Sequence, residues 1–192
     1  GKIQVNNILM AIIAAYKSGI EFKKILKILP SITPVEGRLE KIGKIHNNSK
    51  VILDYAHTPA ALESALSNLK EQFPFNKINL IFGCGGDRDL KKRPLMGKIA
   101  EKYSNEIYLT DDNPRNEKPF KIRNEIKKGI KNKKIHEIPD RKKGIQEAVK
   151  NLKTGDILLV AGKGHEKTQD YGKKRIFFSD QKIILELSLI HI

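Results

Sequence analysis

Four short segments carry the residue types that could bind a charged ligand. They are residues 54–59 (DYAHTP), 83–89 (GCGGDRD), 111–115 (DDNPR) and 162–166 (GKGHE). Each follows a short apolar run that is typical of a buried strand. In parallel α/β sheets, ligands bind outside the carboxyl ends of the strands. We therefore expect the chemistry of this protein at these four strand ends.

The segment 111–115 has the groups that an amino-acid head group needs. Arg115 offers a planar guanidinium that matches a carboxylate, while Asp112 and Asn113 can accept hydrogen bonds from an ammonium. Pro114 stiffens the turn between them. For an isolated match, a solvated Asx-Pro turn would be the better interpretation.

The two glycine-containing segments allow the backbone to come close to a neighbour. In the segment 162–166, Gly162 permits such an approach and Glu166 could complete an ammonium site, whereas nothing in the spacing makes His165 a general base. Three glycines in residues 83–86 indicate either a close approach or a tight turn, and the spacing alone does not decide. Arg88 stands where the third glycine of a dinucleotide fingerprint would be, so this motif is not one.

The segment 54–59 suits a nucleotide. Asp54 can accept from a ribose hydroxyl, and Thr58 with Pro59 predicts a helix N-terminus, which favours a phosphate. Alone, these residues are more often a turn and a helix cap. We find no nucleophile–base pair and no metal-ligand cluster, and the single cysteine, Cys84, excludes a disulfide framework.

Alternating elements must position these segments. Helical spacing and its breakers predict helices over residues 8–16, 21–29, 59–70, 94–103, 119–130 and 141–152 and from 180 onward. Apolar runs predict strands over residues 51–53, 78–82, 107–109, 157–160 and 175–178 and near 135. This alternation predicts an α/β, Rossmann-like, mostly parallel sheet with helices on both faces. Residues 31–37 form the expected linker between two domains.

Composition limits the class of protein. The chain is 39% hydrophobic and 31% charged, as in ordinary globular proteins, and no run reaches the length of a membrane span. The net charge of +15 raises the possibility of nucleic-acid binding, but the lysines are scattered and tryptophan is absent. A solvated basic surface is the better interpretation, with attraction of anionic nucleotides as a second one.

Taken together, the motifs resemble the Mur ligase family, and within it the ligases that use meso-diaminopimelate. The resemblance covers residues 1 to about 185 and rests on PVEGR (34–38), DYAHTP (54–59), GCGGDRD followed by KRPLMG (83–97), TDDNPR (110–115) and AGKGHE (161–166). Five matches in order outweigh the turn and cap alternatives. The resemblance implies that residues 1–33 end a central ATPase domain and that residues 34–192 are the C-terminal domain.

The resemblance also implies an activity. ATP would phosphorylate the D-glutamate carboxylate of UDP-MurNAc-L-Ala-D-Glu, and the amine of meso-diaminopimelate would attack the acyl phosphate. This chain would then be a fragment, inactive alone, of a cytoplasmic, monomeric ligase that binds neither nucleic acid nor membrane. The phosphate loop, the modified lysine and most Mg²⁺ ligands of the family would lie outside it. No metal ligand and no catalytic residue are expected here.

Site residues follow from the same resemblance. The expected diaminopimelate ligands are Arg88, Asp112, Asn113, Arg115, Gly162 and Glu166, and the expected ATP ligands are Asn7, Arg38 and Asp54. Lysine would leave the buried guanidinium of Arg115 unpaired, and family members that use lysine typically lack this arginine, so the motif favours diaminopimelate.

Two departures from the family pattern stand out. Gln4 replaces the usual Asn or His, which bears on the adenine contact, and the tail 188–192 matches nothing in the family. The alternative is a stand-alone module that binds nucleotide or amino acid without catalysis. A start inside a helical pattern without Met favours the fragment.

Overall fold

The computed structural model describes residues 2–33, 35–42, 45 and 48–190. The chain divides into two compact units, residues 1–35 and residues 36–192. Pro34, in the middle of the expected linker, and the last two residues of the tail lie outside the described part, whereas Ser188 to Ile190 continue a helix. No helix among the described residues is long and apolar enough to cross a membrane.

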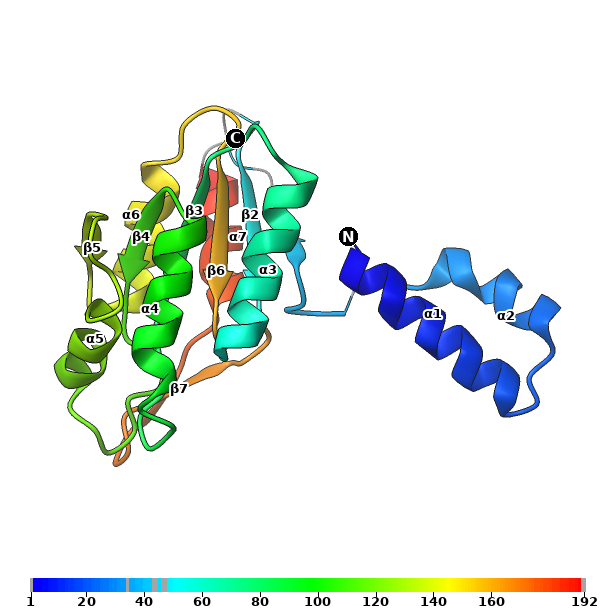
Figure 1. Ribbon diagram of the computed structural model, residues 1–192, viewed down its shortest axis with the longest axis horizontal. Helices are drawn as coiled ribbons and strands as arrows, with labels where there is room; N and C mark the ends of the chain where they lie inside the picture. Colours follow the sequence, from blue (N-terminus) through cyan, green and yellow to red (C-terminus); the bar gives the residue numbers. More distant parts are fainter. Residues whose placement is uncertain (1, 34, 43–44, 46–47, 191–192) are drawn as a thin grey trace. The chain divides into compact units, whose positions relative to one another are not determined.

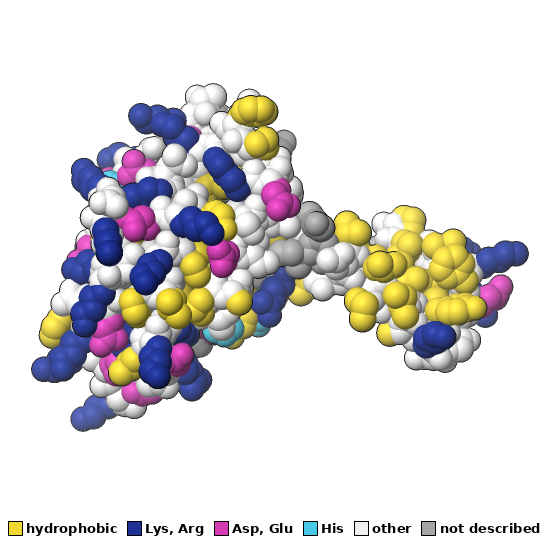
Figure 2. Space-filling model, viewed as in Figure 1, with side chains coloured by type: hydrophobic (Ala, Val, Ile, Leu, Met, Phe, Trp, Pro, Cys, Tyr) yellow, Lys and Arg dark blue, Asp and Glu magenta, His cyan; other side chains and the backbone are white. Residues whose placement is uncertain are grey.

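The N-terminal unit is a pair of helices and a 3-10 turn: α1 (Lys2–Lys17), α2 (Phe22–Ile28) and η1 (Leu29–Ser31). Both predicted helices are present, and Gly19, in a left-handed conformation (φ +89°), ends the first. Most of its large apolar side chains are exposed, among them Leu9 and Met10 (53% and 65%). Figure 2 shows hydrophobic side chains over much of the visible face of this unit.

We expect this unit to be the least protected part of the isolated chain. Because few of its side chains are buried, residues 8–16 should open with a small free energy and exchange their amide hydrogens fastest. Hydrogen exchange followed by mass spectrometry would measure this, with β6 (Ile157–Ala161), which is buried throughout, as the internal reference. Protection of residues 8–16 comparable to that of β6 would contradict the expectation.

The C-terminal unit is a six-stranded sheet covered by helices on both faces (Figure 1). Its elements are β1 (Glu40–Ile42), β2 (Lys50–Asp54), α3 (Pro59–Gln72), β3 (Ile78–Phe82), α4 (Lys92–Tyr103), β4 (Glu106–Leu109), α5 (Pro119–Lys127), β5 (Ile135–Glu137), α6 (Arg141–Lys150), β6, β7 (Thr168–Asp170), β8 (Arg175–Phe177) and α7 (Asp180–Ile190). The strand order is β1-β2-β6-β3-β4-β5, and all neighbours are parallel except β1 and β2. The expected fold class is confirmed.

Two hydrophobic clusters hold the layers together. One lies between the sheet and α3, α4 and α5, and contains Leu66, Met96 and Ile126; the other lies under α6 and α7 and contains Ile145 and Ile184. Strands β3 and β6 are buried at every position, so they read as continuous apolar runs rather than alternating ones.

Local signals explain several helix starts. The hydroxyl of Thr58 accepts from the N–H of Ala61 at 3.2 Å, with Pro59 in the first turn of α3, as predicted. Asp140 caps α6 by accepting from the N–H of Lys143 at 3.0 Å.

The sequence analysis missed two strands and extended several helices too far, α5 by the most residues. Strand β1 is a three-residue edge strand with an exposed lysine, and β7 is Thr-Gln-Asp, so neither has an apolar pattern. Both form because a neighbouring strand pairs with them. Helix α5 ends at Lys127, not at residue 130, and the next residues form a turn against α4, where a side chain on Gly129 would meet the carbonyl oxygen of Pro94 at 1.9 Å.

Candidate functional site

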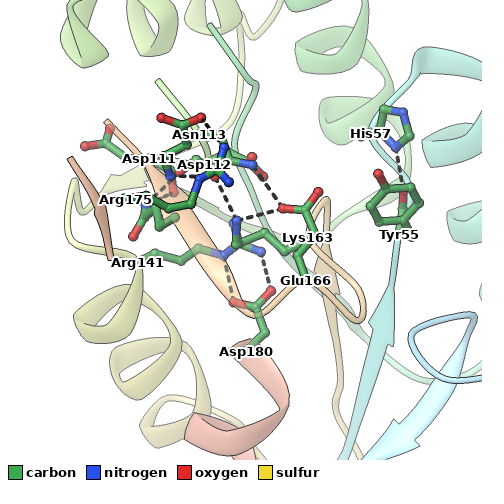
Figure 3. A network of polar contacts seen from close by, with 12 residues as sticks. Tyr55, His57, Asp111, Asp112, Asn113, Arg141, Lys163, Glu166, Arg175 and Asp180 are labelled. Carbon is green, nitrogen blue, oxygen red and sulfur yellow. Dashed lines mark hydrogen bonds and ion pairs between the residues drawn. The ribbon is translucent and has the colours of Figure 1, made fainter. Parts of the chain in front are cut away.

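Parallel pairing brings the four strand-end segments to one edge of the sheet. Strand β6 lies between β2 and β3, and Asp54 is in register with Ala161. Strand β3 pairs with β4, and Phe82 is in register with Leu109. Figure 3 shows residues of the segments after β2, β4 and β6 in one region. The expected meeting of the motifs is therefore observed.

The glycines of the segment 83–89 let it pack against the segment after β4. A side chain on Gly83 would meet the carbonyl oxygen of Thr110 at 2.4 Å, and one on Gly86 would meet that of Pro114 at 1.9 Å. The N–H of Gly86 donates to the carbonyl of Asn113 at 2.9 Å. Of the two alternatives from the sequence, the structure shows close approach, and the neighbour is another loop of the same chain.

Arg115 is fixed by backbone contacts on both sides. It has a left-handed backbone (φ +49°), its N–H donates to the carbonyl of Asp170 at 3.0 Å, and Nη1 donates to the carbonyl of Gly86 at 2.8 Å. Nη1 of Arg115 and Cγ of Arg88 also lie within 4 Å of the position that a side chain on Gly85 would take. The two arginines therefore border the same small region.

Asn113, Lys163 and Glu166 form a closed ring of hydrogen bonds (Figure 3). Nζ of Lys163 donates to Oδ1 of Asn113 at 3.0 Å and to Oε2 of Glu166 at 2.9 Å, and Nδ2 of Asn113 donates to the same Oε2 at 3.0 Å. Burial alone would raise the pKa of Glu166, but hydrogen bonds from Lys163 and Asn113 and the nearby charge of Arg115 hold that pKa below its ordinary value. Glu166 is therefore a carboxylate near neutral pH.

Asp112 is a buried acceptor beside this ring. Its carboxylate oxygen Oδ2 lies 2.8 Å from where a side chain on Gly162 would begin, and Gly162 has a positive φ of +114°. The amide of Gln169, on β7, donates to the backbone carbonyl of Asp112 at 2.7 Å. Gly162 is thus required both for its backbone conformation and for the position of Asp112.

The substitution Gly162→Ala tests the second requirement. We expect it to displace the Asp112 carboxylate and to weaken amino-acid binding by tenfold or more, since the new methyl group and Oδ2 cannot share the space. The matched control is Gly155→Ala, which has a similar φ of +80° but meets only the amide of Asn76 at 3.4 Å. Calorimetric titration of each variant with meso-diaminopimelate would measure amino-acid binding. Thermal unfolding of each variant would measure the effect of backbone strain on stability. Equal binding by the two variants would contradict the assignment.

A fully buried ion pair contacts the ends of β4 and β6, where two of the segments begin. Nε and Nη2 of Arg141 donate to the carboxylate of Asp180 at 2.8 and 2.7 Å. The same guanidinium donates to the hydroxyl of Thr110 at 3.2 Å and to the carbonyl of Ala161 at 2.9 Å. Arg141 therefore joins the starts of α6 and α7 to the ends of β4 and β6.

The expected ATP ligands are only partly brought together. Asp54 is 8% exposed, and its Oδ2 accepts from the N–H of Leu39 at 2.7 Å. Burial raises the pKa of Asp54, and hydrogen bonds from Leu39 and Ala56 oppose the rise. Arg38 is exposed, and its guanidinium carbon Cζ lies 4.7 Å from the centroid of the Tyr55 ring. Asn7 lies in the other compact unit, so its expected role stays a prediction.

The sequence analysis missed Lys163, Arg141, Asp180 and Gln169. Lys163 lies within a motif that was singled out, but a lysine between two glycines gives no sign of burial; here it is 0% exposed. Arg141 and Asp180 are separated from the motifs in sequence and carry no local signal. In the described part of the chain, no group of three or more His, Cys, Asp or Glu side chains could hold a metal ion.

Comparison with known proteins gives consistent results. Residues 37–164 match the family described as Mur ligase, glutamate ligase domain. The chain is 45% identical over 188 residues to the UDP-N-acetylmuramoyl-L-alanyl-D-glutamate–2,6-diaminopimelate ligase of Rickettsia felis, covering 97% of this chain and 35% of that protein. The ligase of the same name from Wigglesworthia glossinidia brevipalpis is 46% identical over 185 residues, covering 96% of this chain and 37% of that protein. The chain thus spans about a third of the length of these relatives.

Solved structures show the same similarity. A structure of a UDP-N-acetylmuramoyl-L-alanyl-D-glutamate–2,6-diaminopimelate ligase matches with a TM-score of 0.77 and 36% identity, covering 99% of this chain and 39% of that one. The UDP-N-acetylmuramate–alanine ligase of Thermotoga maritima, 23% identical, shares the fold with a TM-score of 0.64 over 85% of this chain and 35% of that one. The family match, the relatives and the shared fold together show that this chain belongs to the Mur ligase family.

Proposed function

We propose that this chain is the amino-acid-binding and ATP-closing part of a longer ligase that adds meso-diaminopimelate to UDP-MurNAc-L-Ala-D-Glu. In this proposal, residues 1–33 end the central ATPase domain and residues 34–192 form the C-terminal domain. The names of the relatives that are about 45% identical support the substrate, because the chain matches them over nearly its whole length.

One observation carries the proposal: a fixed cation and two carboxylates face the same strand-end edge. Arg115 is held by two backbone carbonyls, Asp112 lies on the same segment as Arg115, and Glu166 comes from the segment after β6. The distal end of meso-diaminopimelate bears both an ammonium and a carboxylate, and it would satisfy both kinds of group. The distal end of lysine has the ammonium alone and would leave the guanidinium without a carboxylate partner, which costs a few kcal/mol.

The work of these residues is positioning. In the proposed reaction, ATP phosphorylates the D-glutamate carboxylate, the amine of the diamino acid attacks the acyl phosphate, and the amide forms as phosphate leaves. Arg115, Asp112 and Glu166 would hold the far end of the amino acid, so that its near amine faces the acyl phosphate. Arg38 would contact the ATP phosphates and Asp54 the ribose. The use of ATP and a nucleotide-linked precursor supports the expected cytoplasmic location.

The test uses the full-length protein that contains this chain. It is supplied with ATP, Mg²⁺ and UDP-MurNAc-L-Ala-D-Glu, and release of ADP is measured with meso-diaminopimelate or with L-lysine. We expect ADP release to depend on diaminopimelate, with kcat/KM at least a hundredfold lower for lysine. Equal use of lysine would refute the role of Arg115, and no release with either amino acid would refute the ligase proposal.

A further inference from the structure

The position of Lys163 conflicts with a site in which both Asn113 and Glu166 accept hydrogen bonds from the ammonium of a substrate. Its side chain is fully buried, and its ammonium already contacts the oxygens of Asn113 and Glu166. Those are two of the oxygens that were expected to accept from the ammonium of an amino acid. A substrate ammonium must therefore find other acceptors, or Lys163 must leave.

The number of hydrogen bonds that the Asn113 side chain can make determines which group of a ligand it can bind. An amide oxygen has two lone pairs. Oδ1 of Asn113 accepts from Nζ of Lys163 at 3.0 Å and from the N–H of Asp170 at 3.0 Å, so both are occupied. The amide nitrogen has two hydrogens, and one donates to Glu166. Within the described part of the chain, the other hydrogen is what Asn113 retains for a ligand, and it suits a carboxylate.

The two carboxylate oxygens of Glu166 also differ in the partners that they have. Its Oε2 accepts from both Lys163 and Asn113, while Oε1 remains on a side chain that is 31% exposed. Asp112 supplies a second carboxylate beside it, over Gly162. Among the described residues of the site, the acceptors left for an ammonium are therefore Oε1 of Glu166 and the carboxylate of Asp112. The donors left for a carboxylate are Arg115, its neighbour Arg88 and the amide of Asn113.

We propose that Lys163 is a positioning residue that sets the polarity of the amino-acid site, making Asn113 a donor to the substrate carboxylate and leaving one oxygen of Glu166 for the substrate ammonium. The inference rests on the proposed function and extends it, because it assigns the two ends of the zwitterion to separate groups. Lys163 itself touches no substrate in this arrangement. It acts through Asn113 and Glu166.

The first test compares Lys163→Met with Lys167→Met in the full-length protein. Lys167 is exposed and directly follows the segment 162–166, so it is the matched control. We expect Lys163→Met to raise the KM for meso-diaminopimelate at least tenfold while the KM for ATP stays within twofold, and Lys167→Met to change neither. An unchanged KM for diaminopimelate, or an equal rise of both KM values, would overturn the inference.

The pH dependence of this KM distinguishes positioning from a structural defect. The cations that face Glu166 are Lys163 on its own segment, Arg115 on the segment after β4 and Arg141 on α6. Removing Lys163 leaves burial less opposed, so the pKa of Glu166 rises and the carboxylate protonates at a higher pH. As the pH is lowered, the KM of Lys163→Met should begin to increase at a higher pH than the KM of the parent protein. Parallel profiles would overturn the inference.

Asn113→Asp tests the polarity even if Lys163→Met fails to fold. The substitution keeps an oxygen toward Lys163 and replaces the donor by a second oxygen. If Asn113 donates to the substrate carboxylate, the KM for meso-diaminopimelate should rise at least tenfold. If Asn113 instead accepts from the ammonium, the KM should hold or fall, and the inference is wrong. A parent protein that does not use diaminopimelate would refute the proposed function, and this inference would fall with it.

Discussion

Replacing Arg115 by Ala should raise the KM for meso-diaminopimelate by about a hundredfold to a thousandfold. A charged hydrogen-bonded partner of a buried or half-buried carboxylate contributes about 3–4 kcal/mol, and each 1.4 kcal/mol corresponds to a factor of ten. The guanidinium is well placed for this, because the carbonyls of Gly86 and Asp170 fix the residue from both sides. The measurement is steady-state kinetics of the full-length protein with diaminopimelate and with lysine.

The comparison with lysine sharpens this prediction. L-Lysine has no carboxylate at its distal end for Arg115 to bind, so removal of the guanidinium should leave the KM for lysine unchanged or lower it. Discrimination between the two amino acids should therefore fall sharply in Arg115→Ala, with the remaining preference due to Arg88 and the amide of Asn113. Arg115→Lys should lie between the variant and the parent because the charge remains without the planar fork. An undiminished preference for diaminopimelate in Arg115→Ala would show that Arg115 does not recognise the distal carboxylate.

A control separates recognition from loop disorder. Arg175→Ala removes an exposed arginine whose ion pair with Asp170 spans 3.4 Å and whose side chain is 68% exposed. Exposed pairs contribute less than about 1 kcal/mol, so this variant should behave like the parent. Because Arg115 also holds Gly86, a rise in the KM for ATP that matches the rise for diaminopimelate would indicate disorder of the loop rather than loss of a ligand.

Replacing Arg141 by Met should lower the free energy of unfolding by about 3–5 kcal/mol, because it leaves the carboxylate of Asp180 buried and unpaired. Both side chains are 0% exposed, and the guanidinium also satisfies Thr110 and Ala161. Urea unfolding of the 192-residue chain, followed by circular dichroism, would measure the change. The matched control is Lys102→Met, which breaks an exposed pair with Glu63 and should leave the free energy of unfolding almost unchanged.

A double variant tests the reason for this loss. If the cost comes from the orphaned charge, Arg141→Met combined with Asp180→Leu should recover a substantial part of the stability, because a pair of apolar side chains replaces the buried ions. The hydrogen bonds that the Thr110 hydroxyl and the Ala161 carbonyl accept from Arg141 would still be lost, so recovery should be incomplete. A double variant as unstable as the sum of the two single ones would show that the ion pair is not the source.

The alternation of strands and helices, and the place of each motif at a strand end, could be predicted from the amino-acid sequence. Strands β3 and β6 are buried at every position, so their apolar runs were visible without the fold. Helix starts at Thr58 and Pro59 depend on neighbours within one turn, which a sequence displays directly. The motif residues Arg115, Asp112 and Glu166 were identifiable because strand ends and glycine-rich turns are local features, and their order along the chain matched a known family.

How those residues share their hydrogen bonds could not be predicted, because it depends on contacts that form when the chain folds. Lys163 lies fifty residues from Asn113 in sequence, and Arg141 lies 39 residues from Asp180, so parallel strands and helix packing alone bring each pair together. The strands β1 and β7 likewise form because a partner is present, and not because of their own residues. Burial and pairing depend on neighbours from distant segments, and for that reason the sequence indicated the candidate ligand groups but could not show that Lys163 already occupies two of their oxygens.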